Sequence, residues 1–368
     1  MRKILYIAQT RFPTEKAQGL QTAKVCEALG RAGFSVELLI PRRENMIKED
    51  AFTFYSLERL FEVIRLRSLS SSLSSFGFFI ESVSFLLSAK IYSHKKKPYI
   101  IYTTDLFVPF VFPCSVLEAH DMPQTHIWFY RFAWRKIHLI VAKTNVIKNE
   151  LMEKFGVPEN KIIVLPNGID LKIFDTGLSK EEAREKIGLP QGATIALYSG
   201  SFAYKWKGTD TFLQAAAIAK DISFFLVGGL EADIKRATAS FQDLNIFFVV
   251  RKPHKDVPIY LAAADVLVLP DKKGDKVSEG YTSPMKLFEY MASKRPIVAS
   301  DLGSIKEVVG DQEVFFFTPN DPASLAKTIL YVVTHKDESV TRARRAYEVV
   351  KVMSWDNYVK KLFPFLRE

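Results

Sequence analysis

Two series of short apolar runs, each alternating with segments of helical spacing, constrain the fold of this chain most strongly. The first series opens with KILYIAQ at 3–9, LQTAKVCEALGRAG at 20–33 and FSVELLIP at 34–41. Continuous apolar runs of strand length are typical of parallel strands buried on both faces. Because helices connect such strands, the pattern predicts a βαβ unit within a doubly wound α/β sheet.

The pattern continues to about residue 165, is interrupted by the polar stretch 171–194, and then restarts. In the first series we expect further strands near 99–104, 114–120 and 139–144, with helices at 124–136 and 145–155. In the second series we expect strands at 195–200, 223–229, 246–251, 264–270 and 296–301, with helices at 208–219, 231–239, 257–263 and about 284–293. Two consecutive doubly wound domains are therefore predicted, with ligands beyond the carboxyl ends of their strands.

The formal net charge of +10 favours an anionic partner, such as phosphate groups, nucleic acid or an acidic membrane face. Residues 1–170 hold 23 Lys and Arg against 16 Asp and Glu, which is +7 of that total. The chain contains neither G-x-x-x-x-G-K-[ST] nor a G-x-G-x-x-G after its first strand, which argues against a P-loop NTPase and a standard dehydrogenase. H-E-x-x-H, G-x-S-x-G and an RNA-binding signature are absent too.

The two cysteines, Cys26 and Cys114, both lie in apolar runs, so we expect buried free thiols and a reducing compartment. No stretch of about 20 apolar residues lacks charge or proline, and the first apolar run is too short for a signal peptide. The chain is therefore predicted to be cytoplasmic, with peripheral membrane contact left open.

The stretch SEGYTSPMKLFEYMASKRPIVASD at 278–301 contains the first candidate site. Ser283 is predicted to be the N-cap of a helix, with Pro284 at its first position and an end near Ser293. The free N–H groups of this helix start, beside the hydroxyls of Thr282 and Ser283, can hold a pyrophosphate. Glu289, inside the helix, either accepts hydrogen bonds from ribose hydroxyls or is an exposed residue of a solvated stripe.

Two further loops carry candidate residues. Lys205 and Lys207 flank Trp206 between a predicted strand and helix, where they either reach phosphate oxygens or are simply solvated. His120 ends an apolar strand, where it either takes part in proton transfer or substrate binding or is a structural histidine. Asp121 either orients His120 or begins the turn before Pro123.

Five segments resemble, in order and spacing, the retaining nucleotide-sugar-dependent glycosyltransferases of family 4, which have the GT-B fold of two Rossmann-like domains facing a cleft. They are VLEAHDMP, VLPNGIDLKIF, YSGSFAYKWKGTDTFLQAA, KPHKDVPIYLAAADVLVLP and SPMKLFEYMASKRPIVASDLGSIKEVV. SWDNYVKKLF resembles the closing helix of that fold, which packs on the first domain. The resemblance implies an acceptor-side domain at 1–170 with the returning helix at 352–368, and a nucleotide-sugar-binding domain at 171–351.

The resemblance also implies a role for individual residues. Gly19 matches the glycine that lets the backbone approach the donor, and His120 the active-site histidine near the transferred sugar. Lys207 matches the lysine on the donor pyrophosphate. The backbone at Arg251 and Lys252 matches the nucleobase contact. Thr282 and Ser283 match the segment at the phosphates, and Glu289 the carboxylate on the ribose.

Two positions depart from the family pattern. The first of two glutamates in the usual motif would fall at Tyr281, and Glu279 lies two residues earlier. The usual arginine position is Ser201, so one phosphate-binding cation is either missing or supplied by Lys205. We expect these departures to affect the choice of donor sugar more than the fold.

The resemblance implies transfer of a sugar from a nucleotide-diphosphate sugar to a glycan or lipid-linked acceptor, with retention, for cell-surface polysaccharide or glycolipid synthesis. It implies neither a divalent metal nor a cofactor besides the donor, and the sequence shows no cluster with metal-ligand spacing. Two alternatives stay open. One is a noncatalytic sugar-nucleotide-binding homologue, and the other is a GT-B epimerase or phosphorylase.

Residues 56–69 and 74–97 are predicted to form two amphipathic helices in the first domain. Their apolar positions are 57, 60, 61 and 64, and then 76, 79, 80, 83, 86 and 87. Both helices either pack on their own sheet or rest on an anionic bilayer, with Arg59, Arg65, Arg67 and Lys95 to Lys97 nearby.

Overall fold

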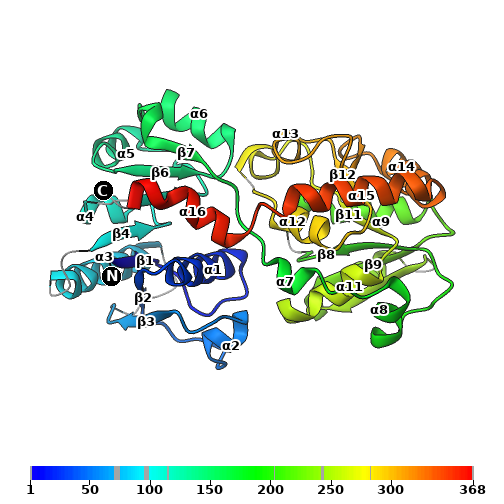
Figure 1. Cartoon of the computed structure of the whole chain (residues 1–368), viewed down its shortest axis with the longest axis horizontal. Helices are drawn as coiled ribbons and strands as arrows, with labels where there is room; N and C mark the ends of the chain where they lie inside the picture. Colours follow the sequence, from blue (N-terminus) through cyan, green and yellow to red (C-terminus); the bar gives the residue numbers. More distant parts are fainter. Residues whose placement is uncertain are drawn as a thin grey trace. The chain divides into compact units, whose positions relative to one another are not determined.

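The structure, a computed structural model, describes residues 2–69, 75–94, 99–113, 116–202, 204–241, 244–281 and 283–366. Thr282, Cys114 and the segment Lys95 to Lys97 lie outside the described residues. The chain divides into two compact units (Figure 1). Unit 1 comprises Met1–Asn167 and Trp355–Glu368, and unit 2 comprises Gly168–Ser354.

Unit 1 is built on a parallel sheet with seven strands among its described residues, in the order β3-β2-β1-β4-β5-β6-β7. The strands are Lys3–Ile7 (β1), Ser35–Pro41 (β2), Phe61–Leu66 (β3), Ile100–Thr103 (β4), Val116–Ala119 (β5), Leu139–Ala142 (β6) and Ile162–Val164 (β7). The helices are Ala17–Arg31 (α1), Ala51–Tyr55 (α2), Ser75–His94 (α3), Val108–Val111 (α4), Ile127–Trp134 (α5), Asn145–Glu153 (α6), Glu159–Lys161 (η1) and Trp355–Leu366 (α16). The order reverses between β1 and β4, which makes this a topological switch point.

Unit 2 repeats the arrangement, with six parallel strands among its described residues in the order β10-β9-β8-β11-β12-β13. The strands are Ile195–Ser199 (β8), Ser223–Gly229 (β9), Ile246–Val250 (β10), Val266–Leu269 (β11), Ile297–Ser300 (β12) and Phe315–Phe317 (β13). The helices are Leu171–Phe174 (α7), Lys180–Ile187 (α8), Lys205–Lys207 (η2), Thr209–Ala216 (α9), Glu231–Ser240 (α10), His254–Asp256 (η3), Val257–Ala263 (α11), Val277–Tyr281 (η4), Met285–Ala292 (α12), Gly303–Lys306 (α13), Pro322–Thr334 (α14) and Lys336–Val350 (α15). Here the switch point lies between β8 and β11.

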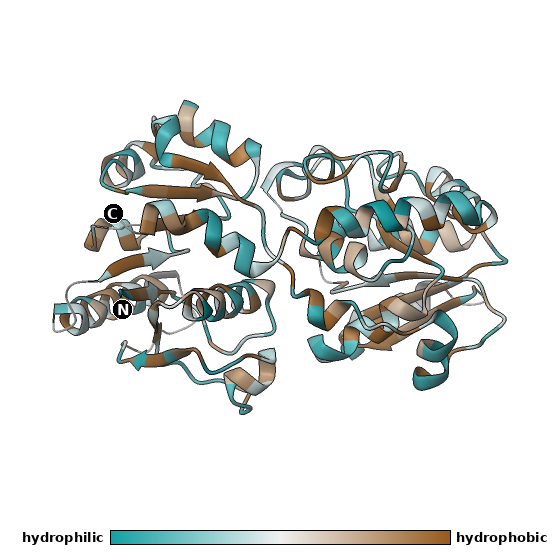
Figure 2. Ribbon diagram, viewed as in Figure 1, coloured by the Kyte–Doolittle hydropathy of each residue, from teal (hydrophilic) through white to brown (hydrophobic). Residues whose placement is uncertain are grey.

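These two sheets confirm the predicted α/β class with two doubly wound, Rossmann-like domains. Apolar residues concentrate in the strands of both units (Figure 2). The predicted helix at 56–69 is wrong, because this segment contains β3. Its apolar residues match helical spacing, but pairing with β2 over six residues satisfies the backbone of Phe61–Leu66 and outweighs that local pattern. The second predicted amphipathic helix is present as α3.

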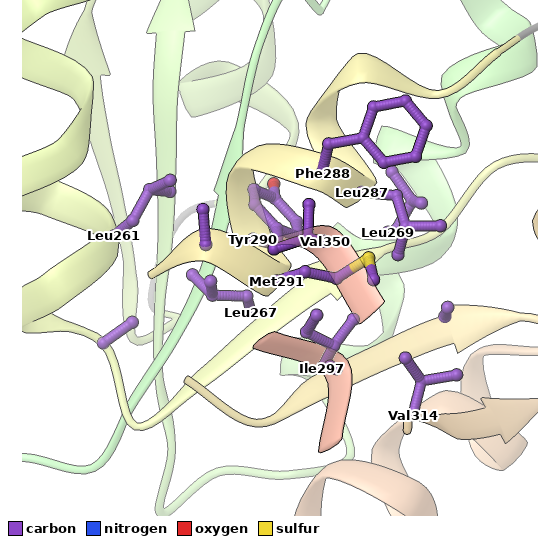
Figure 3. Packing of buried hydrophobic residues seen from close by; sticks show 14 of the residues in the cluster. Leu261, Leu267, Leu269, Leu287, Phe288, Tyr290, Met291, Ile297, Val314 and Val350 are labelled. Carbon is purple, nitrogen blue, oxygen red and sulfur yellow. The ribbon is translucent and has the colours of Figure 1, made fainter. Parts of the chain in front are cut away.

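The core of unit 2 shows why its strands are apolar on both sides. Leu267, Leu269 and Ile297 pack with α12 on one face of the sheet (Figure 3). Val266 and Val268 pack with α9 and α14 on the other face. Four large side chains of α12 are fully buried, and burial of each stabilises the fold by about 1.5–3 kcal/mol. They are Leu287, Phe288, Tyr290 and Met291.

The C-terminal helix α16 packs against α1 of unit 1. Nη1 of Arg31 lies 2.7 Å from Oδ1 of Asp356, and Tyr358 and Leu362 are buried. The last helix therefore adds its apolar face to the core formed by the first 167 residues. None of the described helices combines the length and the apolar character needed to cross a membrane.

Candidate functional site

The switch point of unit 2 brings together the loops that follow β8 and β11. Register pairs Val266 of β11 with Ala196 of β8, so both strands end at the same edge of the sheet. The backbone N–H of Lys272 donates a hydrogen bond to the carbonyl oxygen of Trp206 at 2.7 Å, which joins the two loops. Such a crevice is the usual ligand site of an open α/β sheet.

Two glycines permit this close packing. Gly208 has a φ of +60°, and a Cβ there would lie 1.8 Å from the carbonyl oxygen of Pro270. Gly200 has a φ of +139°, and a Cβ there would lie 2.4 Å from Nζ of Lys286. A side chain at either position would therefore separate the loops or displace the lysine.

Lys207 and Lys286 bring two cationic groups to this crevice. Nζ of Lys286 donates to the Tyr198 hydroxyl at 2.7 Å, and each lysine is close enough to influence the pKa of the other. Burial lowers the pKa of Lys207. Burial and the neighbouring charge of Lys207 together hold the pKa of Lys286 well below its usual range. The alternative that Lys207 is simply solvated does not fit this environment.

Asp271 follows β11 directly and is 5% exposed. Its Oδ1 accepts no hydrogen bond from any residue that the structure describes. Burial raises the pKa of Asp271, although the charges of Lys286 and Lys207 act in the opposite direction. The crevice thus holds charged groups that are desolvated without direct ion pairing, an arrangement that is more common at functional sites than elsewhere.

Glu289 is 7% exposed, so the alternative of an exposed residue on a solvated stripe is wrong. Its Oε1 lies 3.0 Å from Nε2 of His254, whose ring packs edge-on against Phe174 with centroids 5.3 Å apart. The charge of Glu289 also raises the pKa of Lys207 and of Lys286. One carboxylate thereby lies close to both the histidine and the two lysines.

The helix start at α12 differs from the prediction. The helix begins at Met285 with Pro284 in the N-cap position, so Ser283 is not the N-cap. The preceding loop contains a π-helical turn, Val277–Tyr281, and the helix starts one residue later than predicted. Ser283 and Tyr281 are both buried near this start, at 8% exposure.

The other predicted donor contacts lie at the edge of this region. Ser201 is half-buried and its carbonyl oxygen accepts from the Tyr198 hydroxyl at 3.2 Å, whereas Lys205 is exposed in η2. Arg251 is exposed, and its N–H donates to the carbonyl oxygen of Gly229 at 3.0 Å. Lys252 is half-buried and lies two residues before His254.

In unit 1, His120 follows β5 beside a buried ion pair. Its Nε2 lies 3.6 Å from Oε2 of Glu118, and burial lowers the pKa of the imidazole. Lys143 donates to Oε1 of Glu118 at 3.0 Å and to the hydroxyl of Tyr358 at 3.0 Å. Burial alone would raise the pKa of Glu118, but Lys143 and His120 lower it to about 2. The carboxylate is therefore ionised beside a neutral imidazole.

Two predicted residues of unit 1 have local structural contacts. Oδ1 of Asp121 accepts the N–H of Met122 at 2.7 Å, as expected for the start of a turn. Gly19 lies inside the first turn of α1, not at the end of the loop, because the helix begins at Ala17. A Cβ at Gly19 would lie 2.4 Å from the Tyr55 hydroxyl, so internal packing requires glycine there too.

Sequence reasoning missed Lys286, Asp271 and His254. Asp271 could have been found from its place at the end of a predicted strand. Lys286 lies three residues before Glu289 and therefore on the same helix face, but a lysine in a short helix carries no distinctive signal. The contact between His254 and Glu289 joins residues 35 apart and depends on the tertiary fold.

Two other regions do not add to the site. An open hollow of about 430 Å³ is lined by residues of α2 and β3 and by the neighbouring Asp50 and Arg59. None of the predicted site residues that the structure describes lines it. Within the described residues, no group of three or more His, Cys, Asp and Glu side chains is arranged to hold a metal ion.

Comparisons with known protein families match both halves of the chain to glycosyltransferases. Residues 179–349 match the family model of glycosyl transferases group 1, and residues 19–173 match that of glycosyltransferase family 4. Comparison with proteins of curated function gives no significant match.

Three solved structures of similar fold each have 18–19% sequence identity and cover 100% of the chain. Sucrose-phosphate synthase from Thermosynechococcus elongatus is covered over 98% of its length with a TM-score of 0.80. A glycosyltransferase from Rickettsia africae is covered over 98% with a TM-score of 0.77. Anabaena HepE in complex with UDP and glucose is covered over 100% with a TM-score of 0.76.

Proposed function

Because the chain belongs to the GT-B glycosyltransferases of group 1 and family 4, we propose that it moves a sugar, with retention, from a nucleoside diphosphate to a glycan or lipid-linked acceptor. The donor half rests on Lys207 and Lys286, two half-buried lysines near the loop that follows β8, where Gly200 leaves room for Nζ of Lys286. Anabaena HepE, which is similar in fold, binds UDP and UDP-glucose. WaaG, also similar, is involved in lipopolysaccharide biosynthesis, which supports a role in cytoplasmic synthesis of cell-surface glycans.

In this proposal the two lysines stabilise the charge that develops on the departing diphosphate. Lys286 then takes the role of the cation that is missing at Ser201, because it is partly buried beside Lys207 whereas Lys205 is exposed. Two ammonium groups supply positive charge where other transferases use a divalent metal, so the proposal needs no metal. Thr282, Ser283 and Tyr281 are assigned to the same phosphates.

Glu289 binds the ribose hydroxyls, with His254 orienting its carboxylate through the 3.0 Å contact. The backbone at Arg251 and Lys252 is assigned to the nucleobase, since it leads directly into His254. Each of these contacts fixes the position of the donor before the anomeric carbon reacts.

Unit 1 supplies His120, which we assign to the transferred sugar, and Gly19, which we assign to close backbone approach. A neutral imidazole can donate one hydrogen bond and accept another, as contacts with sugar hydroxyls require. Retention places the attack of the acceptor on the face of the leaving group, so the diphosphate oxygen is the group nearest to the acceptor proton.

The test is to incubate the protein with UDP-, GDP- and ADP-sugars and acceptor-containing membranes, and to measure nucleoside diphosphate release. We expect release with one donor class. His120→Ala should lower turnover at least 100-fold while donor affinity changes less than about threefold, and Glu289→Ala should mainly weaken donor binding. Binding without release from any donor would favour the noncatalytic homologue, and unchanged donor affinity in Glu289→Ala would refute the ribose contact.

A further inference from the structure

Helix α3 presents its apolar stripe to solvent. Phe79, Leu87 and Ile91 are 60%, 58% and 70% exposed. The face that packs on the protein is also largely apolar, with Phe85 and Leu86 at 0% and 5% exposure, so α3 is apolar on both faces. A surface helix normally has polar residues on its outer face. The exposed apolar side chains of α3 are therefore suited to contact with an apolar partner outside this chain.

The apolar surface continues through α4 onto α5. Nζ of Lys90 in α3 donates to the carbonyl oxygen of Val111 at 3.1 Å, and Phe110 of α4 stacks on Phe129 of α5 with ring centroids 4.1 Å apart. In Figure 1 the three helices follow one another along one end of unit 1. Helix α5 exposes Trp128 and Phe132, by 73% and 67%.

The exposed charged side chains of α5 and of the two residues that follow it are positive. Residues 127–136 contain three basic residues, Arg131, Arg135 and Lys136, and no acidic one. The ammonium of Lys136 lies 5.5 Å from the ring centroid of Phe132. The one acidic residue of α3 is Glu81, which is buried and paired with Arg43 at 2.6 Å. Exposed aromatic rings beside unopposed cations are typical of proteins that bind anionic lipid headgroups.

We propose that α3 and α5 form an interfacial surface that binds an anionic bilayer. The exposed apolar side chains of both helices enter the boundary between headgroups and acyl chains, and the basic residues of α5 contact the anionic headgroups. The surface lies on the bilayer, in keeping with the absence of a described helix long and apolar enough to span it.

The position of α5 has a consequence that rests on the proposed function. The helix begins at Ile127, seven residues after His120, in the connection that follows β5. Binding through α5 would hold the acceptor half of the site close to the headgroup layer. This favours a lipid-linked acceptor over a soluble glycan.

The experiment is flotation of the full chain with phosphatidylcholine vesicles that contain or lack phosphatidylglycerol. We expect binding to the anionic vesicles at least about tenfold stronger than to the neutral ones. Phe79→Ser with Leu87→Ser, and separately Trp128→Ser with Phe132→Ser, should each weaken binding about tenfold at low and high salt. Replacing Arg131, Arg135 and Lys136 by Gln should weaken binding at low salt only.

The matched control is Leu330→Ser with Val340→Ser, two exposed apolar residues of unit 2, which should bind vesicles like the unmodified chain. UDP affinity should be unchanged in every variant, so loss of vesicle binding is distinguished from loss of the donor site. Quenching of Trp128 fluorescence by brominated lipids should disappear in Trp128→Phe.

Equal vesicle binding by all variants would overturn the proposal, as would no binding of the unmodified chain to either vesicle. A self-association in analytical ultracentrifugation that is abolished by the α3 variant, without vesicle binding, would instead assign the surface to a second copy of the chain.

Discussion

Each unit buries a group of charged side chains near the carboxyl ends of its parallel strands, but the two groups differ in the ion pairs and hydrogen bonds that they form. In unit 1, Glu118 accepts hydrogen bonds from Lys143 at 3.0 Å and from Gln21 at 2.5 Å, and Lys143 also contacts Tyr358. In unit 2, no ion pair among the described residues joins Asp271 to a lysine. The protein itself pairs Glu118 with Lys143, which we call the closed group. Asp271 lacks such a partner among the residues that the structure describes, and it forms the open group with Lys207 and Lys286.

The pKa values show what this difference means. The pKa of Glu118 falls to about 2, despite a burial that would raise it, because its partners favour the ionised form. The pKa of Asp271 is raised and that of Lys286 is lowered, chiefly by burial, which the neighbouring opposite charges offset only in part. A closed group stabilises the fold, whereas an open group gains its missing interactions from a ligand.

The largest expected effect is on stability in unit 1. Glu118→Gln should lower the free energy of unfolding by about 3–5 kcal/mol, because it leaves the buried Lys143 ammonium without its counter-ion. Asp271→Asn, the matched change in the open group, should change it by less than about 1 kcal/mol. Urea denaturation followed by circular dichroism measures both. Equal losses in the two variants would remove the distinction between a closed and an open group.

A second expected effect is on donor affinity in unit 2. Lys286→Met should weaken UDP binding about 10- to 100-fold, because a charge-assisted contact with the diphosphate is lost. Lys205→Met is the control, since this exposed lysine lies in the same loop as Lys207 and should bind UDP within about twofold of the unmodified chain. Calorimetric titration measures both. A larger loss of UDP affinity in Lys205→Met than in Lys286→Met would show that Lys205, and not Lys286, supplies the phosphate-binding cation that Ser201 lacks.

A smaller effect is the acid dependence of stability. The pKa of Glu118 is lower in the folded protein, at about 2, than in the unfolded chain, near 4.5. Its contribution is therefore present above pH 4.5 and is lost as the pH falls towards 2. The difference in unfolding free energy between the unmodified chain and Glu118→Gln should shrink over this range. A constant difference from pH 6 to pH 3 would contradict the assigned pKa.

Local sequence pattern was sufficient to predict two doubly wound domains and most of their strands, because strands buried on two faces are apolar throughout. It did not predict the short strands β7 and β13. It was insufficient for β3, whose backbone is satisfied by pairing with β2, and for α3, whose apolar stripe faces solvent. Periodicity shows that the apolar side chains share one face of a helix, but not whether that face contacts the protein core, solvent or lipid.

The candidate site divides in the same way. Lys207 and Glu289 stand in motifs with recognisable spacing, so they could be predicted. Lys286 and His254 are brought to the site only by the packing of α12 and η3, and no local pattern marks them. The role of Ser283 as N-cap failed because the π-helical turn at Val277–Tyr281 uses additional residues before α12.

Proton uptake on binding of UDP tests most directly whether the open group of unit 2 holds a diphosphate. The lowered pKa of Lys286 should rise when the diphosphate pairs with it. At a pH between the pKa of Lys286 in the free protein and its pKa in the UDP complex, binding therefore takes up protons. UDP affinity should fall as the pH rises through this interval. Calorimetry at a series of pH values below the ordinary pKa of lysine, in buffers of different ionisation enthalpy, should show net uptake that Lys286→Met greatly reduces. Binding without any proton uptake, or uptake that is unchanged in Lys286→Met, would contradict the account.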